Sequence, residues 1–222
     1  MALRYPYYLF DADGTLFDYD AGEYCALTAI LREYALCETQ EIPKWVKAYD
    51  TVNQAMWRQF ERGEISQTTL RTERFRRWLP EGMDYAAVSV RYLEYLGQQS
   101  QMMPGALETI SALAGTAPIA IVTNGITEVQ THRLAGSPLA PYIKALVISE
   151  TVGRPKPHRD MFDVALSKIG GSVNNTLMVG DGQGTDIRGA LAMGMHACFY
   201  NHKRERPVVQ PTFAIQELTE LL

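Results

Sequence analysis

Two kinds of hydrophobic pattern alternate along the chain, and they predict two kinds of structure. Short, continuous apolar runs alternate with stretches in which apolar residues recur every three or four positions. A short run bounded by turn residues is typical of a buried strand, whereas the wider spacing is typical of a helix with one buried side. The predicted strands are 7–10, 118–122, 145–148, 176–179 and 197–200, and the helices predicted between them lie near 105–114, 127–135, 159–169 and 186–193.

Strands that alternate with helices predict a parallel sheet. Each such unit is joined by a right-handed crossover, and the crossover helices cover both faces of the sheet. The predicted fold class is therefore α/β, with a Rossmann-like parallel-sheet core.

The stretch 18–99 has the helical pattern alone. Leu27, Ile30, Leu31 and Tyr34 follow the spacing of one helix face, and the same spacing returns three more times before residue 97. Asp84 stands where it could cap the last of these helices. Because the strand 7–10 has no strand partner in this stretch, we expect residues 1–17 and 100–222 to form one α/β core, with 18–99 inserted as an all-helical domain.

Composition narrows the class of partner. The 222 residues include 25 acidic and 21 basic side chains, so the formal net charge is 21 − 25 = −4. This mildly acidic balance argues against a nucleic-acid polymer as partner, because that binding depends on clustered Lys and Arg. No apolar run approaches the ~18 residues of a membrane span. Three cysteines, an odd number without metal-ligand spacing, suit a reducing cytoplasm.

Polar residues with chemical capability follow four of the predicted strands. Ligands of an open parallel sheet bind beyond the carboxyl ends of its strands, so these residues are expected to meet in one crevice. They are Asp11 and Asp13 after the first strand, Thr123-Asn124-Gly125 after the second, Lys156 on the loop after the third, and Gly180-Asp181-Gly182 after the fourth.

Negative charge in that crevice indicates a cation. Asp11, Asp13, Asp181 and nearby Asp186 outnumber the single Lys156, and close carboxylates must either take up protons or hold a cation. A set of oxygen ligands without His or Cys suits Mg²⁺. The metal and Lys156 together could hold a dianionic phosphate, which is the arrangement that phosphoryl transfer needs.

The same residues carry a resemblance to a known family. The run Asp11-Ala12-Asp13-Gly14-Thr15-Leu16-Phe17-Asp18 resembles the first motif of the haloacid dehalogenase superfamily. Thr123-Asn124-Gly125, Lys156-Pro157 and Gly180-Asp181 with Asp186 resemble its second, third and fourth motifs, in the same order. A helical insert directly after the first motif resembles the superfamily's type 1 cap. The combination of residues 11–20, 56–65, 147–150 and 154–157 also resembles the bacterial pyrimidine 5′-nucleotidases of this superfamily.

The resemblance implies a role for each matching residue. Asp11 is the expected nucleophile, and Asp13 the acid that protonates the leaving oxygen and then activates water. Asp11, the backbone carbonyl of Asp13 and Asp181 would bind Mg²⁺, with Asp186 orienting bound waters or Lys156. Thr123, Asn124 and Gly125 would hold the phosphoryl oxygens, and Lys156 would stabilise their charge.

Three residues are candidates for contacting a base or a sugar. Phe17 follows the catalytic turn, while Trp57 and Arg62 lie in the predicted cap. Packing for the two aromatic side chains, and a solvated charge for Arg62, explain these residues equally well.

The expected function is Mg²⁺-dependent hydrolysis of a small phosphorylated metabolite through an aspartyl phosphate, with a pyrimidine nucleoside 5′-monophosphate favoured. One alternative is a phosphoglycolate or sugar-phosphate phosphatase. Another, of a different class, is a phospho-acceptor signalling domain, which also uses Mg²⁺, an aspartyl phosphate, a hydroxyl and a lysine. The acid at position 13 and the helical insert favour the enzyme, since a phospho-acceptor domain needs neither.

Overall fold

The computed structural model describes residues 4–222, apart from the side chain of Glu61, and these residues form two compact units. One unit comprises residues 4–20 together with Ser100–Leu222, and the other is Ala21–Gln99. Residues 1–3, at the start of the predicted core, lie outside the described residues.

The first unit is built on a parallel sheet, as predicted. In residues 4–222 this sheet has six strands in the order β3-β2-β1-β4-β5-β6, and every neighbouring pair is parallel. At its centre, Leu9 lies opposite Ala120 on one side and Met178 on the other. The strands are β1 (Tyr7–Phe10), β2 (Ile119–Thr123), β3 (Ala145–Ile148), β4 (Thr176–Gly180), β5 (His196–Tyr200) and β6 (Phe213–Ile215).

Strand β6 was not predicted. It has three residues, and its middle residue is exposed, so it lacks the continuous apolar run that marked the other strands. Its place comes from pairing with β5, where Phe199 lies opposite Ala214. A short edge strand of this kind depends on its neighbour and leaves little hydrophobic pattern of its own.

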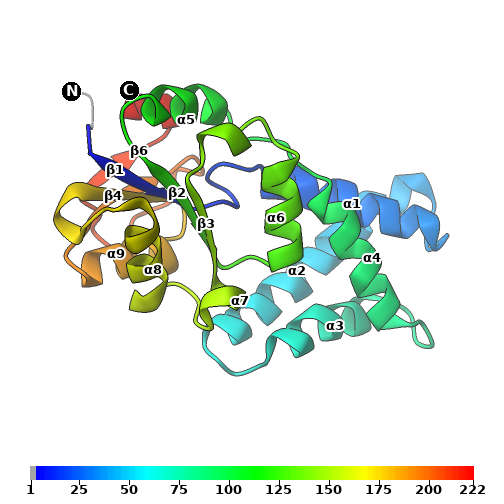
Figure 1. Cartoon of the computed structure of the whole chain (residues 1–222). Helices are drawn as coiled ribbons and strands as arrows, with labels where there is room; N and C mark the ends of the chain where they lie inside the picture. The colour runs from blue at the N-terminus through cyan, green and yellow to red at the C-terminus, as the bar shows by residue number, and fades with distance from the viewer. Residues whose placement is uncertain (1–3) are drawn as a thin grey trace. The chain divides into compact units, whose positions relative to one another are not determined.

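Alternate side chains of the strands enter two separate hydrophobic clusters. Tyr8 and Phe10 pack with α5 (Ala106–Ala114) on one face, and Leu9 packs with α8 (Arg159–Ile169) and α9 (Arg188–Ala192) on the other. Figure 1 shows α5 and α8 on opposite sides of the strands. This unit also contains α6 (Thr127–Ala135), α7 (Ser149–Val152) and 3₁₀ turns at Ala140–Tyr142, Val173–Asn175 and Leu218–Leu221. The predicted Rossmann-like α/β core is confirmed.

The helix predicted at 186–193 differs at its start. A π-helical turn, η4 (Gln183–Ile187), precedes α9. The carbonyl oxygen of Gly182 accepts from the amides of both Asp186 and Ile187, at 2.8 and 3.2 Å. This wider turn sets the position of Asp186 just beyond the end of β4, and π turns often occur where a side chain must be placed for function.

The second unit is helical, as the spacing of its apolar residues predicted. It contains α1 (Tyr19–Glu33) from Ala21 onward, a 3₁₀ turn at Thr39–Glu41, α2 (Ile42–Glu61), α3 (Gln67–Trp78) and α4 (Tyr85–Gly97). The prediction that Asp84 caps the N-terminus of α4 is confirmed, because the Asp84 side chain accepts from the amide of Ala87 at 3.0 Å. Aromatic rings fill the interior: Tyr49 packs edge-on against Trp78, with 5.0 Å between the ring centroids.

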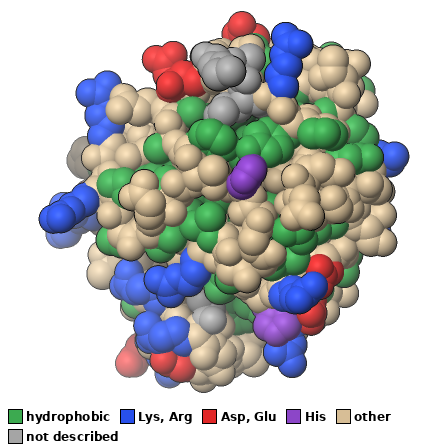
Figure 2. Space-filling view, turned by 90° about the vertical axis from the view of Figure 1, so that its left-hand side faces the viewer, with side chains coloured by type: hydrophobic (Ala, Val, Ile, Leu, Met, Phe, Trp, Pro, Cys, Tyr) green, Lys and Arg blue, Asp and Glu red, His purple; other side chains and the backbone are tan. Residues whose placement is uncertain are grey.

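The structure also bears on membrane-spanning segments, on the cysteines and on the distribution of surface charge. In the part of the chain that the structure describes, no helix combines the length and apolar character that crossing a membrane requires. Cys198 is buried in the core, as a small hydrophobic residue would be, while Cys25 is exposed. Figure 2 shows one face on which hydrophobic and uncharged side chains mix across the middle, and charged side chains lie mostly around the margin and in the lower part.

Candidate active site

The site begins where β1 ends. Asp11 continues the strand by one residue, since its amide donates to the carbonyl of Val179 at 2.9 Å. The chain then turns at Gly14, which has a φ of +79° that side-chain-bearing residues rarely adopt. A Cβ at Gly14 would also lie 2.5 Å from Oδ2 of Asp181. Gly14 therefore lets the first turn pass directly over Asp181.

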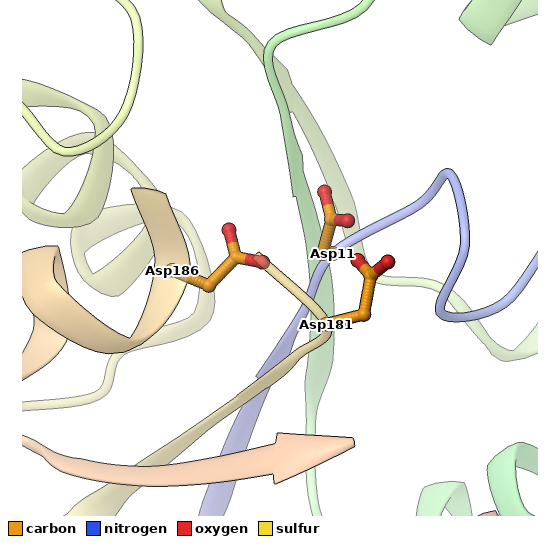
Figure 3. Close-up of side chains that lie close together, drawn as sticks. All are labelled: Asp11, Asp181 and Asp186. Atoms are coloured by element: carbon orange, nitrogen blue, oxygen red, sulfur yellow. The ribbon is translucent and has the colours of Figure 1, made fainter. Parts of the chain in front are cut away.

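Three carboxylates come together at this edge of the sheet. Asp11, Asp181 and Asp186 each offer an oxygen, and these oxygens all lie within 4.8 Å of one another. Figure 3 shows that Asp11 comes from the segment after β1, whereas Asp181 and Asp186 both come from the segment after β4, with Asp11 and Asp181 side by side. Asp181 is fixed by Thr15, whose hydroxyl accepts from the Asp181 amide at 3.1 Å. Asp186 accepts from the Gly182 amide at 2.9 Å.

Lys156 provides the positive charge of the site. Its ammonium lies 2.6 Å from Oδ1 of Asp11 and 2.7 Å from Oδ1 of Asp186, and it donates to the carbonyl of Val122 at 2.6 Å. The side chain is only 2% exposed. Burial alone would lower the pKa of Lys156, but the charges of Asp11 and Asp186 outweigh it and raise the pKa. Lys156 is therefore held as a cation.

One ammonium does not balance three carboxylates. Burial raises the pKa of Asp11 well above its ordinary value, against the opposing effect of Lys156. Burial and the neighbouring Asp186 raise the pKa of Asp181 to about 6. Both shifts report that the ionised forms lack compensating positive charge. The oxygen donors, their close spacing and this excess negative charge fit a hard divalent cation such as Mg²⁺.

The loop after β2 is tied to the loop that carries Lys156. The Asn124 side chain accepts from the Lys156 amide at 2.7 Å and donates to the Lys156 carbonyl at 3.0 Å. It thus holds the lysine backbone on both sides. Thr123 is 1% exposed, and its hydroxyl accepts from the amide of Gly125 at 3.0 Å. A hydroxyl that accepts one bond keeps its own proton to donate.

Asp13 lies apart from the three carboxylates. Among the described residues, its side chain is not one of the group that could hold a metal; the prediction gave it a metal contact through its backbone carbonyl alone. The carboxylate is instead bound by α6. Gln130 Nε2 donates to Oδ2 at 2.6 Å, and Arg133 forms an ion pair with Oδ1.

Sequence reasoning did not identify Gln130 and Arg133. The available signal was two polar residues three positions apart on the predicted helix 127–135, close after Thr123-Asn124-Gly125. Polar residues at that spacing are ordinary on a helix surface. Their burial, 2% and 1% exposed, is what distinguishes them, and it is visible only in the fold.

The three predicted base- or sugar-contacting residues have other partners within their own units. Phe17 is 1% exposed and belongs to the hydrophobic cluster of the core. Trp57 packs edge-on against Phe60 at 5.8 Å between centroids. Arg62, which is exposed, pairs with Glu64 at 2.5 Å. Contact of these three with substrate stays a prediction.

Comparison with known proteins gives the class of this chain. The haloacid dehalogenase-like hydrolase profile matches residues 5–194. The chain is 32% identical to the pyrimidine 5′-nucleotidase YjjG of Escherichia coli, over 99% of this chain and 97% of YjjG. It is 35% identical to the pyrimidine 5′-nucleotidase PynA of Streptococcus pneumoniae, over 98% of this chain and 94% of PynA.

A solved structure agrees in both sequence and fold. The crystal structure of the putative HAD-hydrolase YfnB from Bacillus subtilis, bound to magnesium, matches with a TM-score of 0.88 and 32% identity, over 98% of this chain and 97% of YfnB. Fold and site are those of an α/β enzyme with its polar groups at the carboxyl edge of a parallel sheet. The chain belongs to the haloacid dehalogenase-like hydrolase family, and the predicted class of hydrolase is confirmed.

Proposed function

We propose that this protein is a Mg²⁺-dependent phosphomonoesterase that forms an aspartyl phosphate on Asp11. The observation that carries the proposal is the buried contact of 2.6 Å between Asp11 and Lys156, inside a group of three carboxylates. A strand-end carboxylate beside a fixed cation suits a nucleophile that must approach a dianionic phosphate.

The reaction divides into two transfers. In the first, an Asp11 oxygen bonds to phosphorus as the ester P–O bond breaks, and Asp13 gives its proton to the leaving oxygen. In the second, Asp13 takes a proton from water while the water oxygen bonds to phosphorus and Asp11 is released. Thr123 donates its hydroxyl proton to a phosphoryl oxygen, together with the backbone amide of Asn124, while the Gly125 amide donates to the Thr123 hydroxyl and orients it. Lys156 offsets the charge on Asp11 and on the phosphoryl group.

Mg²⁺ is the proposed metal, held by Asp11, Asp181 and the backbone carbonyl of Asp13, with Asp186 close by. When bound, the ion supplies positive charge for the phosphate and for the excess of carboxylates. This assignment rests on the donor set and on the raised pKa values of Asp11 and Asp181.

The proposed substrates are nucleoside 5′-monophosphates, with pyrimidine bases favoured. The support is the similarity to YjjG and PynA, which extends over nearly the whole chain and so includes the helical unit as well as the core. We further propose that residues 18–99 act as a cap over the site, and that the reaction takes place in the cytoplasm.

Phosphate release from a panel of esters tests this function. The panel contains pyrimidine and purine nucleoside monophosphates, phosphoglycolate and sugar phosphates, each with and without Mg²⁺. Asp11→Asn provides the blank, since it removes the nucleophile at nearly constant shape. We expect Mg²⁺-dependent release that is fastest from the pyrimidine nucleotides and lost in the variant.

The other outcomes separate the alternatives. Faster release from phosphoglycolate or a sugar phosphate would overturn the nucleotidase assignment and keep the chemistry. Release from none of the esters, with a phosphoryl group retained on Asp11 after incubation with acetyl phosphate, would support a phospho-acceptor domain instead.

A further inference from the structure

We propose that Gln130 and Arg133 are positioning residues that determine where the acid–base carboxyl group of Asp13 lies. This inference rests on the proposed function, because it concerns the proton transfers assigned to Asp13. The three residues belong to the same compact unit.

Both oxygens of Asp13 are held by one helix. Gln130 Nε2 donates to Oδ2 at 2.6 Å, and the Arg133 guanidinium pairs with Oδ1. Gln130 and Arg133 lie three residues apart on α6, so their side chains leave the same face of the helix. A carboxyl group held at two separate oxygens has its rotation fixed as well as its position.

The loop after β2 leaves space for the Gln130 side chain. A Cβ at Gly125 would lie 2.3 Å from Gln130 Nε2 and 2.9 Å from its Cδ. The absence of a side chain at position 125 thus allows Gln130 to reach Asp13. This close approach explains a glycine at position 125 independently of any contact with phosphate.

Arg133 is buried chiefly for its contact with Asp13. The side chain is 1% exposed, and its Nε and Nη2 atoms have no hydrogen-bond partner among the groups that the structure describes. Its guanidinium lies over the ring of Phe17, 5.5 Å from the centroid. Burying N–H groups without partners is unfavourable, so an arginine that served only packing would be a poor choice here. The ion pair with Asp13 is therefore the contact that accounts for an arginine at this buried position.

The two residues are suited to different oxygens of Asp13. Arg133 only donates hydrogen bonds, and Oδ1 can accept from it whether or not the carboxyl group carries a proton. The oxygen held by Gln130, Oδ2, is then the one that carries the proton to the leaving oxygen and later receives one from water. Gln130 Nε2 can donate to Oδ2 in both states, because a carboxyl oxygen that carries a proton still has lone pairs that accept.

Leaving-group dependence distinguishes positioning of the acid from support of the fold. A nitrophenolate leaves without needing a proton, whereas an alkoxide needs one. We would measure kcat/KM for p-nitrophenyl phosphate and for the alkyl ester that the wild type cleaves fastest. Gln130→Met, Arg133→Met and Gly125→Ala are each expected to reduce kcat/KM for the alkyl ester about 10-fold more than for p-nitrophenyl phosphate. Asp13→Asn should also reduce kcat/KM more for the alkyl ester than for p-nitrophenyl phosphate. Adding Gln130→Met to Asp13→Asn should not widen this difference between the two esters.

The matched control is Arg159→Met, which removes an exposed ion pair with Asp163 on α8 and should leave the ratio of the two kcat/KM values unchanged. Equal losses for both esters in Gln130→Met and Arg133→Met would overturn the inference, because a purely structural role lowers both alike. Arg133→Lys keeps a cation near Asp13 and should lose less kcat/KM for the alkyl ester than Arg133→Met, which keeps the test available if Arg133→Met folds poorly. If the wild type cleaves neither ester, the proposed function has failed rather than this inference.

Discussion

The ammonium of Lys156 and Oδ1 of Asp11 lie 2.6 Å apart, and both side chains are almost fully enclosed by the core. Two segments 145 residues apart in the sequence are joined by this contact. Removing Lys156 leaves the buried carboxylates of Asp11 and Asp186 without their cation, so this contact links the stability of the site to its chemistry.

Lys156→Met tests that link. We expect activity to fall at least about 100-fold, as is usual when a donor to the reacting oxygens is lost. The free energy of unfolding of the metal-free protein should fall by about 3 kcal/mol, because Asp11 and Asp186 lose their cation. Chemical denaturation and phosphate release measure the two effects. Lys168→Met, an exposed lysine on α8, is the control and should change neither. An active Lys156→Met variant would contradict the assigned role.

Gly14→Ala is expected to weaken metal binding more than it weakens the fold. Its Cβ would lie 2.5 Å from Oδ2 of Asp181, and alanine at a φ of +79° is strained by about 1 kcal/mol. Gly170→Ala has the same backbone strain at a φ of +81°, with nothing within 4 Å of its Cβ. The two variants should therefore lose similar stability, while Gly14→Ala alone loses Mg²⁺ affinity in a calorimetric titration. Equal Mg²⁺ affinity in both would count against the site.

Mg²⁺ should stabilise the protein more near neutral pH than in acid. The pKa of Asp181 is raised to about 6 in the metal-free fold, from an ordinary value of 3.8. A raised carboxyl pKa means that the stability which its protonated form contributes is lost as the pH rises through about 6. Mg²⁺ binds the ionised form and restores stability above that pH.

Melting temperatures measure this effect. At a Mg²⁺ concentration about 100 times Kd, a rise in Tm of roughly 5–10 °C is expected near pH 7.5. Near pH 5 the rise should be less than about half as large, since the ligands must lose protons first. A rise that does not depend on pH, or one that survives in Asp181→Asn, would indicate that Mg²⁺ binds elsewhere.

Asn124→Ala tests whether the Asn124 side chain positions Lys156 for activity, as distinct from only stabilising the fold. The Asn124 side chain bonds to both the amide and the carbonyl of Lys156, and its loss leaves those groups unpaired, at a cost of about 1–3 kcal/mol. Activity should fall about 10-fold or more through displacement of the lysine. Asn175→Ala removes a comparable bond, from the Ser172 amide at 2.7 Å, and should lower stability without lowering activity. Unchanged activity in Asn124→Ala would show that the loop holds Lys156 without this side chain.

The sheet, its crossover helices and the residues at its strand ends were predictable because each leaves a local pattern. Strand β1 is a continuous apolar run, and Asp11 follows it directly. Neighbouring residues therefore indicate both the buried strand and the reactive side chain at its end. Lys156 also followed a predicted strand, and its position in the crevice came from the parallel topology alone.

The features that escaped prediction depend on contacts between distant residues. Strand β6 forms only because β5 offers it an edge. Arg133 looks like a surface residue in the sequence, and its burial against Asp13 depends on where α6 packs. The π turn before α9 forms because the Gly182 carbonyl accepts from two amides, and the spacing of hydrophobic residues does not predict such a hydrogen bond.

Detection of a phosphoryl group on Asp11 during turnover tests the central claim most directly. The protein would be quenched in acid within the first turnovers of its best ester, digested, and analysed by mass spectrometry. The account predicts the added mass of one phosphoryl group on the peptide that contains Asp11, lost in Asp11→Asn and increased in Asp13→Asn when p-nitrophenyl phosphate is the substrate. Turnover with Asp11 unmodified at every quench time, or a phosphoryl group on another residue, would contradict it.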